Sequence, residues 1–321
     1  MAYLLRAVLA SILATVLVPG AWAQGYPSKL VRIVIPTSAG GVSDPAARWI
    51  AQKLSENWTQ PVILDFRDGA SGIIGTDHVA KSAPDGYTML FNTGGFWYQQ
   101  ATAANLPYTL QDFAPITPAL SGPTVFVANA SLGAANVKEL IALAKKSPGK
   151  LTFASTGAGG PPHMNAELFK VLTGTDILHV PYKGAGPAIV DVVAGRVDMM
   201  FTGLPVVAPH LKTGKLVAIA VSSMERSRSL PDLPSVHEQG VTGFDAGSRM
   251  GFIAPARTPE DTINRIHGGL VKVLSTPETR KTFAGLGIEP IHSTPAEYSA
   301  WIRSQVERWI QVAKSAGLKR E

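Results

Sequence analysis

The stretch "IVIPTSAGGVSDPAARW", residues Ile33–Trp49, joins an apolar run, a loop of small residues and the start of a helix. Its β-branched first part is typical of a buried strand. Glycine in the loop lets the backbone turn tightly and leaves N–H groups uncovered. The following helix has Ser43 or Asp44 as a candidate N-cap and Pro45 in its first turn. The stretch therefore predicts a strand–loop–helix unit.

The chain contains this unit a second time. The first copy reads "VRIVIPTSAGGVSDPAARWIAQKL", "PVILDF", "RDGASGIIGTDHVAK" and "YTMLFNTGG", and the second reads "GKLTFASTGAGGPPHMNAELFKVL", "DILHVPY", "KGAGPAIVDVVAG" and "VDMMFTGLP". The Ala-Gly-Gly triplets at 39–41 and 158–160 are 119 residues apart, and the Gly-Ala pairs at 69–70 and 184–185 are 115 apart. This shared order predicts two similar α/β lobes with parallel strands.

Two extended apolar segments are expected to connect the lobes. One, residues 124–132, follows the first copy, and the other, residues 249–256, follows the second. Two crossings return the C-terminal segment to the first lobe. We therefore predict a first domain of residues 24–125 plus 249–321 and a second domain of residues 126–248.

The C-terminal segment is predicted to end in a long helix. Thr294 and Glu297 form a capping box, with Pro295 in the first turn. Apolar residues recur at helical spacing and are expected to face the core. They are Tyr298, Trp301, Ile302, Trp309 and Val312.

Residues 1–23 have the pattern of a secretory signal peptide. Arg6 precedes an apolar run over Ala7–Val18, and Ala-Trp-Ala at 21–23 precedes Gln24. The run of about 12 residues is shorter than the roughly 20 residues that a membrane-spanning helix needs. We therefore expect export and cleavage after Ala23.

Composition excludes several classes of site. The chain has no cysteine, which excludes disulfides and thiolate metal sites. The net charge is +6, and without Arg6 there are 28 basic against 23 acidic residues. The excess is spread out, with Lys145-Lys146 as the longest basic run, so no nucleic-acid partner is expected. A mild positive charge suits a small anionic ligand.

The two glycine loops are the main candidate site. A helix start carries unpaired N–H donors and about half a positive charge, and it therefore binds anions. Ligands of open α/β sheets bind at the carboxyl ends of the strands. Two facing lobes would aim both loops at one cleft, where one carboxylate accepts N–H bonds from both. The alternative is that the glycines only make tight turns. Thr156 is a weaker candidate cap for the second helix, which has Pro161-Pro162 at its start.

No catalytic or metal-binding motif is found in the sequence. Neither loop matches the P-loop or the full dinucleotide pattern, and no G-x-S-x-G elbow occurs. The seven histidines show no metal-ligand spacing. We therefore predict no enzyme activity, no cofactor and no metal, with a hydrolase whose triad assembles in space as a remote alternative. His163 opens the second helix and is predicted either to line the cleft or to cap or pack.

The motifs "PTSAGG", "APDGYT", "DFAPIT", "HVPYKG", "GRVDMMF", "RSLPDLPSVHEQG" and "GFIAPARTP" resemble those of the tripartite tricarboxylate transporter receptors, also called the TctC or Bug family. The resemblance runs from Tyr26 to the last helix. It implies a periplasmic solute-binding protein of the type II architecture, with two Rossmann-like domains joined by two crossing strands. Such a receptor, expected to be a monomer, delivers a small carboxylate to a membrane permease with a large and a small subunit. A ligand sensor for a signalling protein is the alternative.

The resemblance also implies a set of ligand-binding residues. In the family, the two loops hold the ligand carboxylate largely through backbone amides and ordered water. Carried over to this chain, they are Thr37, Ser38, Ala39, Gly40, Gly41 and Asp44 in the first loop, and Ser155, Thr156, Gly157, Ala158 and His163 in the second.

Three further residues bear on specificity. Thr202 stands where the family often has aspartate, and Arg249 stands where it often has tryptophan. Arg249 is predicted either to grip a distal carboxylate or to be a solvated or ion-paired arginine. Phe96 in "NTGGFWYQQ" offers an aromatic wall, or else covers the core. We therefore expect a dicarboxylate, first an aromatic one such as terephthalate and next an aliphatic one such as adipate.

Overall fold

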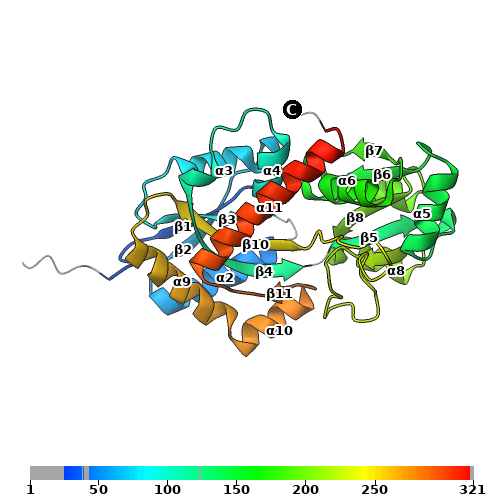
Figure 1. The fold of residues 1–321 in the computed structure, drawn as a ribbon. Coiled ribbons are helices and arrows are strands. Elements are labelled where there is room, and N and C mark those ends of the chain that lie inside the picture. The colour runs from blue at the N-terminus through cyan, green and yellow to red at the C-terminus, as the bar shows by residue number, and fades with distance from the viewer. Residues whose placement is uncertain (1–24, 38, 40–42, 123, 319–321) are drawn as a thin grey trace, which may run out of the picture.

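Two sheets, each covered by helices, form two adjacent lobes in the computed structural model, which describes residues 25–37, 39, 43–122 and 124–318 (Figure 1). The predicted signal peptide lies outside these residues. The first sheet has the order β2-β1-β3-β10-β4-β11, and the second β7-β6-β8-β5-β9. The strands of the first are β1 (Val31–Ile35), β2 (Val62–Phe66), β3 (Thr88–Asn92), β4 (Phe113–Gly122), β10 (Ser248–Pro255) and β11 (Glu289–Pro290). Those of the second are β5 (Thr124–Asn129), β6 (Thr152–Ser155), β7 (Leu178–Pro181), β8 (Met199–Gly203) and β9 (Leu216–Val221).

The helices alternate with the strands along the chain. In the first lobe they are α2 (Asp44–Trp58), α3 (Ile73–Ala80), α4 (Gly95–Thr102), α9 (Glu260–Leu274), α10 (Pro277–Gly285) and α11 (Pro295–Ser315). In the second lobe they are α5 (Val137–Lys146), α6 (Pro161–Thr173), α7 (Ala185–Val193) and α8 (Leu204–Lys212). Short 3-10 turns cover Ala70–Gly72, Leu110–Asp112 and Ala130–Leu132. Among the described residues, no helix combines the length and apolarity that crossing a bilayer requires.

The repeat predicted from the sequence is confirmed by the sheet topology. In the first lobe β1 pairs in parallel with β2 and β3, and in the second lobe β6 pairs in parallel with β7 and β8. In both sheets an antiparallel strand follows, β10 beside β3 and β5 beside β8. The chain crosses between sheets from β4 to β5 and again from β9 to β10. The carboxyl ends of the repeated strands therefore lie at the edges where the lobes face each other.

One apolar core runs through both lobes. It includes Leu90 and Trp97 of the first lobe, Phe126 and Phe169 of the second, and Trp309 of α11. Figure 1 shows α11, in red, running from the first lobe to α6 of the second. Burying these large rings is worth roughly 2 kcal/mol each, so the lobes share a continuous packed contact beside their crossing strands.

The C-terminal helix forms as its sequence predicts. Thr294 and Glu297 make the capping box, with each side chain bonded to the other's backbone N–H. Tyr298, Ile302, Trp309 and Val312 are buried, whereas Trp301 is half-buried. The stripe is therefore mainly core packing, and Trp301 also lines a cavity between the lobes.

Candidate functional site

The first residue after β1 and the glycine turn after β6 both lie near one helix, α4. A Cβ atom on Gly159, in the turn after β6, would lie 2.7 Å from Thr102 Oγ1 of α4. A Cβ atom on Gly72 would lie 3.0 Å from the carbonyl oxygen of Pro36, which follows β1, and 3.5 Å from Gln99 Nε2 of α4. Gln99 and Thr102 are neighbours on one helix face, because residues three apart lie one above the other. Pro36, at the start of the turn after β1, and Gly159, in the turn after β6, thus both lie close to α4.

The second turn binds three of its own amides internally. Gly157 donates its N–H to Ser155 Oγ at 3.2 Å, and Gly159 donates to His163 Nδ1 at 3.0 Å. Gly160 donates to the carbonyl oxygen of Gly157 at 3.4 Å. His163 is 6% exposed and packs behind the turn while it accepts the Gly159 N–H, and whether it also lines a ligand cleft stays a prediction.

The start of α6 differs from the prediction. Its N-cap is Gly160 and not Thr156, because a residue before proline is held extended and the helix begins at Pro161. Pro161-Pro162 also lack N–H groups, so this helix start offers fewer donors than most. Among the described residues, no protein acceptor takes the amides of Thr156, Ala158 or His163. These three amides are the turn's candidate donors for a ligand.

The first turn is seen only at its ends, because Ser38, Gly40 and Gly41 lie outside the described residues. Thr37 is half-exposed and Ala39 is exposed. Ser43 occupies the N-cap position of α2 without a side-chain cap bond.

Asp44 is the first residue of α2, and its side chain is only 9% exposed. Its Oδ1 lies 2.7 Å from Arg48 Nε, one helical turn along. A carboxylate at this end of a helix is stabilised by the helix dipole. The first turn is therefore flanked by an ion pair, whereas the second is flanked by histidines.

The histidines behind the second turn form a stacked pair. The rings of His163 and His179 have centres 3.9 Å apart and planes 12° apart. Burial, and then the neighbouring His163, lowers the pKa of His179 to about 4. Burial alone would raise the pKa of Glu167, but hydrogen bonds from His163 and Lys170 outweigh it and lower that pKa. No sequence pattern singled out His179, since its partners lie on β6 and α6 and only the fold brings them beside β7.

Thr202 and Phe96 occupy different environments. Thr202 is 4% exposed at the end of β8, two residues beyond Met200, which pairs with Ala154 of β6. It therefore lies at the same sheet edge as the second turn. Phe96 is 3% exposed, and its ring packs against those of Tyr108 and Phe113. The structure thus supports the core interpretation for Phe96 and not the aromatic wall.

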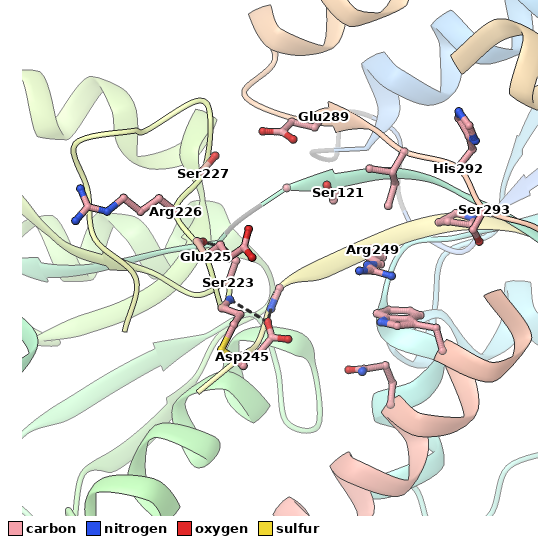
Figure 2. Close-up of a pocket in the computed structure, with 17 residues that line it drawn as sticks. Ser121, Ser223, Glu225, Arg226, Ser227, Asp245, Arg249, Glu289, His292 and Ser293 are labelled. Atoms are coloured by element: carbon pink, nitrogen blue, oxygen red, sulfur yellow. Dashed lines mark hydrogen bonds between the residues drawn. The ribbon is translucent and has the colours of Figure 1, made fainter. Parts of the chain in front are cut away.

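Arg249 lies in a separate cavity between the lobes, of about 540 Å³ (Figure 2). Its guanidinium carbon is 4.9 Å from the centre of the Trp301 ring, a cation–π contact. Further lining residues include Ser121, Ser223, Asp245 and His292. None of the described glycine-turn residues lines this cavity. Arg249 therefore stacks on Trp301 of α11 at the edge of this cavity, and its role toward a distal carboxylate stays a prediction.

Asn92 is a neighbour of the site that the sequence analysis did not select. It ends β3, is 1% exposed, and its Oδ1 accepts the Gly94 N–H at 3.1 Å. An amide side chain directly after an apolar strand and before Gly-Gly was the available signal. Within the described part of the chain, no group of His, Asp or Glu side chains is arranged to hold a metal ion.

Comparisons with known proteins show the family to which the chain belongs. The "Tripartite tricarboxylate transporter family receptor" description matches residues 46–318. The R. palustris protein Rpa4515, solved with adipate, is 32% identical, with a TM-score of 0.81 over 92% of this chain and 99% of its own. The periplasmic binding protein BugD is 31% identical, with a TM-score of 0.80 over 92% of this chain and 100% of its own.

A third structure, MatC (Rpa3494) from Rhodopseudomonas palustris with bound malate, is 27% identical. Its TM-score is 0.78 over 89% of this chain and 99% of its own. The family match covers most of the chain, and the structural matches cover both lobes. The chain therefore belongs to the tripartite tricarboxylate transporter receptors, a family of periplasmic solute-binding proteins.

Proposed function

We propose that this protein captures a small dicarboxylate between its lobes and delivers it to a membrane permease with a large and a small subunit. The observation that supports the proposal is that Pro36, which opens the turn after β1, and Gly159, in the turn after β6, both lie close to α4. Each turn belongs to one copy of the repeat, so one carboxylate accepts hydrogen bonds from both lobes. Binding then favours the closed arrangement, because only that arrangement assembles the full set of donors.

Two observations favour an aliphatic dicarboxylate. Relatives have been solved with adipate and with malate, which both carry two carboxylates. Phe96, Trp97 and Tyr98 are each buried in the core, which removes the support for an aromatic wall. We therefore place adipate and malate ahead of terephthalate. Thr202 adds no negative charge at the sheet edge beside the second turn.

The proposed location is the periplasm, reached through a signal peptide at residues 1–23. We infer cleavage after Ala23, so the mature chain begins at Gln24 and acts as a monomer. The proposal includes no chemical step: the ligand leaves unchanged. Intact-mass measurement of the protein from the periplasmic fraction tests the cleavage site.

A thermal-shift screen followed by calorimetry tests the ligand class. Adipate, malate and terephthalate are compared with hexanoate, which keeps adipate's chain length but has one carboxylate. A dicarboxylate at a hundredfold excess over its dissociation constant stabilises the protein by about 2.7 kcal/mol. We expect adipate or malate to give the largest shift and hexanoate a smaller one. No shift with any carboxylate would contradict the proposal.

A further inference from the structure

The stacked histidines behind the second turn come from different parts of the chain. His163 belongs to α6 and His179 to β7, and Phe153 of β6 stacks on His179 with ring centres 4.8 Å apart. His179 is paired in register with Phe153, so the sheet itself fixes where its ring lies. The proposed function uses the turn but gives His179 no role.

Each ring holds one part of the turn. His163 Nδ1 accepts the Gly159 N–H at 3.0 Å. His179 Nε2 lies 2.6 Å from Ser155 Oγ, and that oxygen accepts the Gly157 N–H at 3.2 Å. Two amides are thereby fixed on protein acceptors. Ala158, between them, is the exposed residue of the turn.

These bonds depend on where the imidazole protons lie. A ring nitrogen that accepts an N–H carries no proton, so the proton of His163 is on Nε2. That nitrogen faces Glu167 Oε1 at 3.6 Å. A second proton, on Nδ1, would remove the acceptor of the Gly159 N–H. Charging both stacked rings would also place two positive charges in close contact.

We propose that His179 is a positioning residue for carboxylate binding, because its stack on His163 and its bond to Ser155 hold the second turn in shape. The amides of Thr156 and Ala158 are thereby kept available for the ligand. The inference rests on the proposed function and deepens it, since His179 acts through the turn and touches no ligand.

The surroundings of the pair restrict what can perturb it. The charged groups that face it among the described residues are both on α6: Glu167, and Lys170 with its Nζ 2.9 Å from Glu167 Oε1. β6 contributes Ser155 and Phe153. The side-chain bonds that hold Gly157 and Gly159 therefore run through Ser155 and the two histidines.

Amide exchange in the ligand-free protein tests the positioning role. Protection factors of Gly157 and Gly159 are measured by NMR in the wild type, His179→Phe and His163→Gln. His179→Phe keeps a flat ring but frees Ser155, so Gly157 protection should fall about tenfold. In His163→Gln the side-chain amide oxygen can still accept the Gly159 N–H, so the protection of Gly159 should stay close to the wild-type value.

His237→Phe is the matched control, because His237 Nδ1 accepts the Gly243 N–H at 3.0 Å at an exposed site in the same lobe. This substitution should lower the protection factor of the Gly243 amide and leave those of Gly157 and Gly159 unchanged. Unchanged Gly157 protection in His179→Phe would overturn the proposal.

Adipate titration by calorimetry completes the test. His179→Phe should weaken adipate binding about tenfold, in step with the exchange result. Altered exchange with unchanged adipate affinity would overturn the positioning role. If the wild type binds none of the screened carboxylates, the proposed function fails, and exchange still decides whether His179 holds the turn.

Discussion

The two glycine turns occupy equivalent places in the repeat but are supported by different chemistry. The turn after β1 leads into α2, where Asp44 pairs with Arg48 at 2.7 Å. The turn after β6 leads into α6, whose two leading prolines have no N–H and whose His163 holds a glycine amide. The difference teaches that duplicated topology fixes where a site lies, while local residues decide which donors are left for a ligand.

Gly159→Val should have the largest effect on this comparison. Gly159 has a φ of +70°, a backbone conformation in which valine is strained. The Cβ atom of the valine would also lie 2.7 Å from Thr102 Oγ1. We expect adipate affinity to fall about a hundredfold or more, because the second turn is pushed away from α4. Calorimetry measures the loss.

Gly174→Val is the matched control for that substitution. Gly174 ends α6 with a φ of +62°, and a Cβ there meets no atom within 4 Å. It should cost about 1–3 kcal/mol of stability through backbone strain while leaving adipate affinity unchanged. Equal losses of adipate affinity in Gly159→Val and Gly174→Val would show that backbone strain explains the loss, and not the position of Gly159 next to α4.

Acid should weaken the contacts behind the second turn, which involve His179, more than the Asp44–Arg48 ion pair beside the first turn. The pKa of His179 is lowered from 6.5 to about 4 in the folded protein, so between these values the unfolded chain binds a proton that the folded chain does not. This contribution to stability is complete above pH 6.5 and is lost as pH falls toward 4. The loss should be about 1–3 kcal/mol.

Denaturant unfolding at a series of pH values measures that loss. His179→Phe should have a shallower decline than the wild type over this window, because phenylalanine takes up no proton. Parallel declines in the two proteins would mean that His179 titrates alike in the folded and unfolded states.

Asp44→Asn should have the smallest effect and probes the first turn. The substitution removes a nearly buried carboxylate from a helix start and should lower stability by about 0.5–1 kcal/mol. Asp77→Asn is the control, since Asp77 also pairs with the residue four positions on, Lys81, but lies inside α3 with 25% exposure. If thermal unfolding shows that Asp77→Asn loses as much stability as Asp44→Asn, the position of Asp44 at the start of α2 adds nothing to its ion pair.

Most of the fold was predictable because it depends on patterns that act locally. Apolar strands that alternate with glycine loops at matched spacing predicted the two lobes. The Thr294–Glu297 capping box predicted the start of the last helix. The α2 cap was predicted to within one residue, since Ser43 holds the N-cap position.

The site was harder to predict because side-chain direction depends on tertiary packing. The register of β10 against β4 shifts between Met250 and Gly251, so alternation along the strand does not reveal where Arg249 points. Phe96 turns into the core through contacts with Tyr108 and Phe113. Both residues lie outside the segment around Phe96, so the sequence of that segment does not reveal the contacts. His179 gains its role only when β7 is placed beside β6.

A crystal structure of the protein with adipate tests the central claim most directly. The account predicts one carboxylate of adipate between the lobes, accepting N–H bonds from Thr156 or Ala158 on one side and from the turn after β1 on the other. Adipate bound instead in the cavity beside Arg249 and Trp301, with neither turn in contact, would contradict it.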